Sequence, residues 1–312
     1  MEEELKMTSD IVIKGTDLQA SKDKIDLIKG LSFEVLRGEI FGIASVQKAP
    51  VRALILMLGG FMKPEKGELK FAGITTAESG RKDGKISVHL SDVSFPPKMT
   101  VEEILRFSGL LRGSNPMAIR ERVDELVSLL DLKSMLRTKW DSLDSSTKGK
   151  IAIVASLIGD PDYIIMDYFP PFEGDFELLV KNYLVSLAGI GKTIVAATEQ
   201  PEGFCDRVLV LRGPSSFEIG MPDVLKSRDL GYGRIEIIVS GVSLSKVEDA
   251  LMRANCSWHY IAEDRLLVIA PGSPSETDYV LSELINNGGK IEEVKTSSPT
   301  FKDLLRLRTE GQ

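Results

Sequence analysis

The pattern of apolar and polar positions changes several times along the chain, and each change predicts a different element. Residues 10–19 and 28–43 alternate apolar and polar side chains between glycines, which is typical of strands at the start of a sheet. Residues 38–60, GEIFGIASVQKAPVRALILMLGG, predict an apolar strand, a short polar loop and an apolar helix. This is the order of a phosphate-binding turn, yet the loop ASVQKAP contains no glycine and no Gly-Lys-Thr.

The middle of the chain changes to the period of helices. Residues 86–95 first predict one more strand. Thr100 and Glu103 then have the spacing of a capping box, and residues 117–132 predict a second helix, so we expect a helical insert over about residues 92–160. The apolar stripes are Ile104, Leu105, Leu110 and Leu111 in the first helix, and Ile119, Val123, Leu126, Val127 and Leu130 in the second.

Strands and helices alternate after these two helices. Residues 146–161 predict a helix, and residues 162–168, DYIIMDY, form a nearly continuous apolar run that ends at Asp167. Such a run suits a strand buried on both faces of a parallel sheet, with its acid at the carboxyl end where ligands of α/β sheets bind. A helix over residues 176–192 and strands over 193–198 and 207–213 complete the pattern of a doubly wound α/β fold.

The pattern resets at residues 227–234, SRDLGYGR, where glycines and charges predict a linker. Beyond it we expect strands over 234–241, 258–271 (two, about a tight turn) and 290–296, with helices over 243–255 and 275–289. This β-α-β-β-α-β order predicts a small ferredoxin-like α+β domain, followed by a last helix over residues 300–308. The chain of 312 residues therefore divides into domains at 1–228 and 232–312.

Composition and charge exclude several classes of function. A hydrophobic fraction of 43% and a charged fraction of 27% are ordinary for a globular protein. The net charge of −7 argues against a nucleic-acid binder, which normally presents a basic face. The most apolar run, residues 53–62, is about half of the ~20 residues that cross a bilayer. We expect a cytoplasmic protein with no membrane span of its own and no nucleic-acid partner.

The cysteines and histidines do not predict a metal site. Cys205 and Cys256 lie far apart and form no CxxC pair. His89 and His259 have no cysteine or carboxylate at the spacing of metal ligands. We therefore assign no metal ligand from the sequence.

Several segments together resemble the ATP-binding cassette of ABC transporters. Residues 31–43, LSFEVLRGEIFGI, are similar to the two strands that lead into the family's Walker A loop, and residues 57–73 to the stretch after it. Residues 159–168 resemble the Walker B strand, and residues 205–211 with 220–225 resemble the cassette's end. Residues 297–308, SSPTFKDLLRLR, look like the end of the small C-terminal domain on many exporter-like and antibiotic-resistance-like cassettes. The resemblance implies a P-loop-NTPase-like fold and an ATPase that uses Mg²⁺.

The Walker A loop departs from the family's pattern. The glycines that allow a close backbone approach to phosphate are missing, and Pro50 has no N–H to offer. Val51 stands where the resemblance implies the phosphate-binding lysine, and Arg52 where it implies the hydroxyl that binds Mg²⁺. The aligned positions are Ser45, Val46, Gln47, Lys48, Ala49, Pro50, Val51, Arg52 and Ala53.

The other nucleotide-site positions implied by the resemblance depart as well. Lys22 aligns with the aromatic residue that stacks on adenine, Ser91 with the coupling glutamine and Glu199 with the switch histidine. Asp167 keeps the Walker B carboxylate, but Tyr168 replaces the catalytic glutamate. A phenol with an ordinary pKa of about 10 is a poor general base at neutral pH.

The LSGGQ signature of the family appears here as LDSST over residues 143–147. Asp144 puts a negative charge where the serine would meet the γ-phosphate, and Ser145 and Ser146 replace the glycines. Family cassettes dimerise head to tail, so that each site combines the Walker A loop of one subunit with the signature of the other. This chain is altered in both halves of that arrangement.

These departures favour a pseudo-ATPase that keeps the cassette fold as a scaffold or regulator. Its expected partners are a membrane transporter subunit, a second cassette in a homodimer or heterodimer, or both, at the inner face of the membrane. In the family, the region of residues 91–104 receives the membrane subunit's coupling helix, so Phe95, Pro96 and Pro97 are candidate contacts. The alternative is that this loop packs on the cassette's own helices.

Two other hypotheses stay open at this point. In the first, the chain is a divergent but active ATPase, with Lys48 or Arg52 holding phosphate and Asp167 holding Mg²⁺ through water. ATP and Mg²⁺ are cofactors only in that case. In the second, the C-terminal domain senses a ligand or forms a dimer and the cassette is a scaffold.

Overall fold

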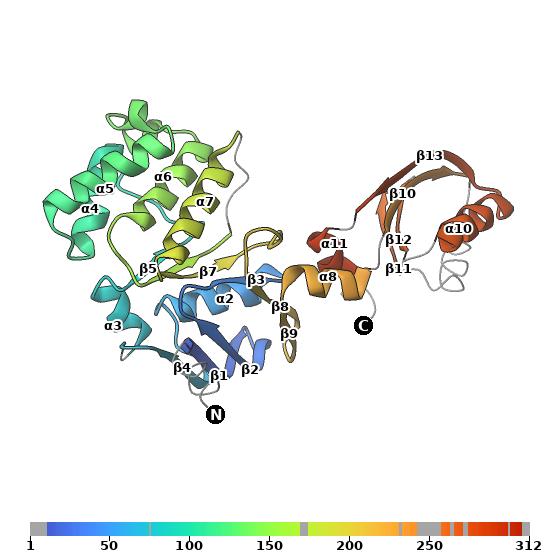
Figure 1. Ribbon diagram of the computed structural model, residues 1–312, viewed down its shortest axis with the longest axis horizontal. Coiled ribbons are helices and arrows are strands. Elements are labelled where there is room, and N and C mark those ends of the chain that lie inside the picture. The colour runs from blue at the N-terminus through green and yellow to red at the C-terminus, as the bar shows by residue number, and fades with distance from the viewer. Residues whose placement is uncertain are drawn as a thin grey trace. The chain divides into compact units, whose positions relative to one another are not determined.

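The structure is a computed structural model, shown in Figure 1. It describes residues 11–74, 76–168, 174–230, 233–241, 257–262, 265–270, 274–298 and 300–307. Contacts divide these residues into two compact units. The first contains the residues up to Thr198 together with Gly203–Ile219, and the second contains Glu199–Glu202 together with the residues from Gly220 onward. The predicted domain limits at residues 228 and 232 stay predictions.

A mixed sheet of six strands forms the centre of the first unit. Parallel pairing joins five of its strands. The strand for which the sequence predicts burial on both faces, over residues 163–166, is fully buried, and so are the strands over residues 40–44 and 193–197. The α/β fold predicted from the alternation of strands and helices is therefore confirmed. The sheet order is β5 (Ile86–His89), β6 (Tyr163–Met166), β7 (Thr193–Ala197), β3 (Ile40–Ala44), β8 (Arg207–Gly213) and β9 (Ser216–Gly220).

A second, antiparallel sheet of the first unit has the order β2-β1-β4. Its strands are β1 (Ile11–Lys22), β2 (Ile25–Leu36) and β4 (Lys66–Phe71), of which the sequence pattern predicts the first two. Their buried side chains share a core cluster with α2 (Lys48–Leu58) and with one face of the parallel strands. In Figure 1 these blue elements lie on one side of the six-stranded sheet.

Helices of the predicted insert cover the other side of the six-stranded sheet (Figure 1). The Thr100 side chain accepts a hydrogen bond from the Glu103 backbone N–H at 3.3 Å, and the Thr100 N–H donates to the Glu103 carboxylate at 2.8 Å. This confirms the predicted capping box. The insert contains α4 (Val101–Leu111), α5 (Pro116–Leu129) and α6 (Ser145–Leu157). α7 (Phe176–Gly189) shares their core cluster, and the short α3 (Ala77–Lys82) lies beside β5.

The apolar stripe of α4 is only partly buried. Ile104 and Leu105 lie in the core, whereas Leu110 and Leu111 are 54% and 65% exposed. Gly109 takes the inward position in that turn, because an added Cβ there would lie 2.6 Å from Ile119. The stripe of α5 is buried along its whole predicted length. The last turn of α4 therefore presents apolar surface outward.

The second unit contains an antiparallel sheet with the order β11-β12-β10-β13. These strands, with α10 between β12 and β13, agree with the predicted elements, but the helix expected over residues 243–255 lies outside the described residues. The ferredoxin-like assignment stays a prediction. The elements are α8 (Pro222–Leu230), β10 (Gly233–Ser240), β11 (Ser257–Ala262), β12 (Arg265–Ala270), α10 (Pro274–Asn286), β13 (Lys290–Ser297) and α11 (Phe301–Leu307).

Two sequence predictions are wrong in extent. The strand expected over residues 86–95 ends at His89, because the next residues turn toward Asp167 and hydrogen-bond to it. The linker expected over residues 227–234 is helix α8 as far as Leu230, and β10 begins at Gly233. No helix in the part of the chain that the structure describes is both long and apolar enough to cross a membrane.

Candidate functional site

The candidate site begins at the start of α2, where the loop after β3 turns into the helix. Ser45 is buried, and its hydroxyl accepts a hydrogen bond from the Gln47 N–H at 3.2 Å. Gln47 is the N-cap of α2 but its side chain makes no capping hydrogen bond. Pro50 lies in the first turn, where a proline is tolerated because that N–H has no partner inside the helix. The loop is thus an ordinary strand-to-helix turn without glycine.

The side chains along the first turns of α2 differ in exposure. Val46, Gln47, Lys48 and Ala49 are exposed. Pro50, Val51 and Ala53 are buried, the last two in the core cluster that α2 shares with the antiparallel sheet, and Arg52 is partly exposed. Val51, at the position that the resemblance assigns to a phosphate-binding lysine, has 0% exposure. Its side chain therefore serves the core.

Asp167 lies directly after β6 and is 3% exposed. The hydroxyl of Ser91 donates to its Oδ2 atom at 2.7 Å, and the Ser91 N–H donates to the same atom at 3.3 Å. The Asp167 N–H donates to the carbonyl of His89 at 3.0 Å, which fixes the carboxyl end of β6 beside that of β5. The structure thus brings together two residues, Ser91 and Asp167, that lie 76 positions apart in sequence.

Arg52 connects α2 to this carboxylate. Its Nη1 group forms a short ion pair with Asp167 Oδ2, and its Nη2 group lies 2.5 Å from Asp92 Oδ1. The Arg52 side chain is 27% exposed, whereas the Asp92 side chain is 73% exposed. The buried partner of the guanidinium is therefore Asp167, and Asp92 closes its outer side.

The pKa of Asp167 lies below its ordinary value. Burial alone would raise this pKa, but hydrogen bonds from Ser91 and from the Tyr168 backbone, with the positive charge of Arg52, outweigh it. Asp167 is therefore an anion at neutral pH, and Arg52 is a permanent cation because a guanidinium does not lose its proton in proteins. The pair at the end of β6 is fully charged.

Curated relatives cover about two thirds of the chain or more. The Nod factor export ATP-binding protein I of Ralstonia nicotianae is 28% identical over 218 residues, 68% of this chain and 67% of that protein. The linearmycin resistance ATP-binding protein LnrL of Bacillus subtilis is 25% identical over 240 residues, 74% of this chain and 76% of that protein. No known family model matches the chain.

Solved structures share the fold of the chain. An ATP-binding subunit of an ABC transporter aligns with a TM-score of 0.64 at 19% identity, over 70% of this chain and 92% of that one. A dimeric ATP-binding cassette bound to ADP and Pi aligns with a TM-score of 0.59 at 18% identity, over 67% and 98%. The chain is similar to the ATP-binding cassettes of ABC transporters in sequence and in fold. The resemblance stated from the sequence is therefore confirmed.

Tyr168 follows Asp167 in this cassette and packs partly buried against the core cluster around α2. The ammonium of Lys48 lies 5.8 Å from the centre of its ring, a cation–π distance. The start of α2 and the end of β6 therefore contact each other through two pairs, Lys48 with Tyr168 and Arg52 with Asp167. Asp92, which pairs with the exposed side of Arg52, was not predicted from the sequence, because a single acidic residue in a loop belongs to no recognisable motif.

The LDSST segment lies at the start of α6. Asp144 is the N-cap, and its carboxylate accepts hydrogen bonds from the Thr147 N–H at 2.8 Å and from the Thr147 hydroxyl at 2.7 Å. These bonds lower the pKa of Asp144. Ser145 and Ser146 form the first turn of the helix. Asp144 thus stays negative, and its carboxylate caps the helix.

Two predicted site residues lie elsewhere. Lys22 is exposed at the end of β1. Glu199 belongs to the second unit, where it pairs with Lys302 of α11 at 3.0 Å. The assignment of all these residues to nucleotide-site positions stays a prediction, but the structure does join Arg52, Ser91 and Asp167 in one charged cluster.

Replacing Arg52 with methionine should destabilise the cassette by roughly 1–3 kcal/mol, because the buried Asp167 carboxylate loses its cation. The double replacement Arg52→Met with Asp167→Asn should recover part of this loss. Urea unfolding of the three proteins measures the change.

The matched control is Lys14→Met, which removes an ion pair with Glu34 whose side chains are 52% and 40% exposed. We expect a change within about 0.5 kcal/mol there. Equal losses in Arg52→Met and Lys14→Met would contradict the buried role of Arg52.

His89 should make the cassette sensitive to mild acid. It is 2% exposed, and burial lowers its pKa to about 4. The unfolded chain takes up this proton near pH 6.5. Between about pH 4 and pH 6.5 the folded state binds fewer protons than the unfolded state. The free energy of unfolding should therefore fall by about 2 kcal/mol from pH 7.5 to pH 5. Urea midpoints at both pH values, in wild type and His89→Gln, check this, since the glutamine variant should lose most of the difference.

Proposed function

We propose that this cassette is a transport subunit that does not carry out standard ATP hydrolysis. The ion pair between Arg52 and Asp167 is the observation that carries the proposal. Asp167, which aligns with the metal-binding acid of the family, forms its ion pair with Arg52 of the same chain. Arg52 in turn stands where the family has a hydroxyl ligand of Mg²⁺. A guanidinium repels a divalent cation, so the residues at this site do not fit the metal.

Other described residues support the same proposal. Val51 is buried in the core and has no ammonium to offer a phosphate. Tyr168 brings a phenol to the position of the general base. Asp144 adds a negative charge at the start of α6, which opposes a second anion there.

Equilibrium binding of a fluorescent ATP analogue with Mg²⁺ tests the proposal. We expect no binding displaced by ATP at millimolar concentration, and no hydrolysis above background, with an intact cassette as positive control. Displaceable, Mg²⁺-dependent binding would support the divergent ATPase instead, in which the exposed Lys48 and the uncapped start of α2 hold phosphate. Arg52→Met should not restore hydrolysis, because Val51 and Tyr168 remain.

We infer that the subunit acts by docking on a membrane partner at the cytoplasmic face. The names of its relatives, a Nod factor export protein and a linearmycin resistance protein, support a role in export. The loop with Phe95, Pro96 and Pro97 is held in place, since the Met99 and Asp141 N–H groups donate to the Pro96 and Pro97 carbonyls. Both prolines are exposed, whereas the Phe95 ring packs edge-on against Trp140 at 5.1 Å.

Apolar side chains are exposed beside this loop. Phe61 is 49%, Val93 40% and Leu111 65% exposed, and all three line one pocket together with Phe95. A partner that covers them removes apolar surface from water, which favours association. The Phe95 ring contacts Trp140 and also borders this exposed apolar surface, so it can pack within the cassette and still take part in the proposed contact with a partner.

A photo-crosslinking amino acid at Leu111 should join the cassette to a multi-spanning membrane protein in cells that express both. The control position is Ile190, which is 72% exposed in the turn after α7. Crosslinks should form from position 111 and not from 190. Equal yields from both positions, or no membrane protein in either product, would show that this surface is not the docking site.

A further inference from the structure

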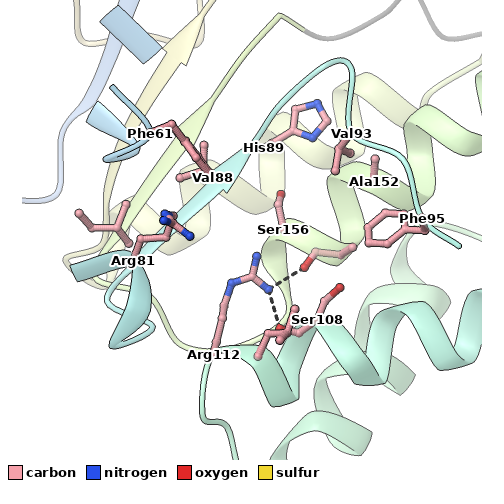
Figure 2. A pocket seen from close by; sticks show the side chains of 13 residues that line it. Phe61, Arg81, Val88, His89, Val93, Phe95, Ser108, Arg112, Ala152 and Ser156 are labelled. Atoms are coloured by element: carbon pink, nitrogen blue, oxygen red, sulfur yellow. Dashed lines mark hydrogen bonds between the residues drawn. The ribbon is translucent and has the colours of Figure 1, made fainter. Parts of the chain in front are cut away.

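The pocket beside Phe95 lies between β5, α3, α4 and α6, and its volume is about 230 Å³ (Figure 2). Its walls are mostly apolar. Its lining contains two arginines and no carboxylate, although the whole chain has a net charge of −7. The lining residues are Phe61, Arg81, Ile86, Val88, His89, Val93, Phe95, Ser108, Leu111, Arg112, Ala152, Ala155 and Ser156.

The third basic side chain of the lining, His89, adds no charge at neutral pH, because burial lowers its pKa to about 4. The charge of the pocket therefore comes from Arg81 and Arg112. In Figure 2 their guanidinium groups point into the same space. Two like charges at one apolar pocket favour an anion between them.

Arg112 is anchored by the fold. Its Nη1 group donates to the carbonyls of Ser108, Ala155 and Ile158 at 3.0, 2.9 and 3.2 Å. These bonds join the end of α4 to the end of α6. Burial lowers the pKa of Arg112 to about 10, so the side chain still carries its charge at neutral pH. Arg112 thus has a structural role that accounts for its burial.

Arg81 has no comparable anchor. Its guanidinium lies 4.4 Å from the centre of the Phe61 ring, and its Nε atom is buried without a hydrogen-bond acceptor among the residues that the structure describes. Glu78, an acid on the same helix, forms an ion pair with Lys82 at 2.7 Å. A buried donor without an acceptor costs free energy. Because no hydrogen bond to another described residue holds the guanidinium in this position, the side chain can shift to meet a carboxylate that a partner supplies, and that bond removes the cost.

We propose that Arg81 selects an acidic partner segment at this pocket, with a carboxylate on its guanidinium and a neighbouring apolar side chain against Phe61, Val93 and Leu111. This proposal rests on the docking role proposed above. The occupant is a cytoplasmic segment of the membrane subunit that carries Asp or Glu beside an apolar residue. Charge complementarity and the exposed apolar rim together favour such a segment over a basic or purely apolar one.

A pair of small probes tests the chemistry on the full chain. 3-Phenylpropanoate carries the carboxylate and an apolar ring, and 3-phenylpropanamide has the same shape without the charge. We expect the acid to bind at least about tenfold more tightly than the amide, because a charge-assisted hydrogen bond replaces a neutral one. Titration followed by NMR, with the Arg81 Nε–H signal as one reporter, measures both affinities.

Variants decide whether Arg81 is the selecting residue. Arg81→Gln should abolish the preference for the acid, and Arg81→Lys should keep part of it, because lysine retains the charge without the guanidinium fork. The control Arg106→Gln removes an exposed arginine of α4 that pairs with Glu102, and should leave the preference unchanged. Equal binding of acid and amide by the wild type, or an undiminished preference in Arg81→Gln, would overturn the proposal.

Crosslinking from position 111 separates this proposal from the docking role on which it rests. A membrane-protein crosslink that weakens in Arg81→Gln but not in Arg106→Gln supports both. An unchanged crosslink in Arg81→Gln leaves the docking role standing and contradicts selection by Arg81. Absence of the crosslink in the wild-type background contradicts the docking role itself. If Arg81→Gln fails to fold, the probe pair on wild type and the Arg81→Lys variant still decide the question.

Discussion

The candidate site depends on one electrostatic constraint, the need of a buried carboxylate for a cation. Asp167 is almost fully buried at the carboxyl end of β6, and desolvation of an unpaired charge there would be costly. Arg52 supplies the cation from α2, and Ser91 supplies two further donors. The helix, the strand and the loop after β5 are thereby tied to each other. An internal guanidinium is always present and always charged, so the cluster needs no ligand to be complete.

The fold around this cluster does not depend on nucleotide chemistry. Two apolar clusters cover the two faces of the central sheet and hold β3, β6 and α2 in place. The loop after β3 can therefore lose its glycines, and Val51 can join the core, without loss of the frame. Pro50 is compatible with the first turn of α2 for the same geometric reason that makes it unsuitable for binding phosphate, namely its missing N–H.

The two arginines of the pocket beside Phe95 show why burial alone does not identify a binding residue. The Nη1 group of Arg112 donates hydrogen bonds to three backbone carbonyls, so the position of this side chain follows from the packing of α4 on α6. Arg81 rests on an aromatic ring with a buried nitrogen that has no acceptor in the described part of the chain. Gly109 occupies the inward position in the last turn of α4. Leu110 and Leu111, the next residues, are therefore on the outward side of the helix and are exposed.

The sequence by itself determined most of the local elements and the resemblance to ATP-binding cassettes. The capping box at Thr100, the buried run before Asp167 and the spacing of the cassette segments are short-range patterns, and periodicity and capping are fixed by neighbours in the chain. Only the tertiary structure decided that Arg52 meets Asp167, that the β5 strand ends at His89, and that Arg81 and Arg112 share a pocket. These features depend on contacts between residues far apart in sequence. A local pattern does not show which charged side chains will meet, because their contacts form only when the sheet and the helices pack together.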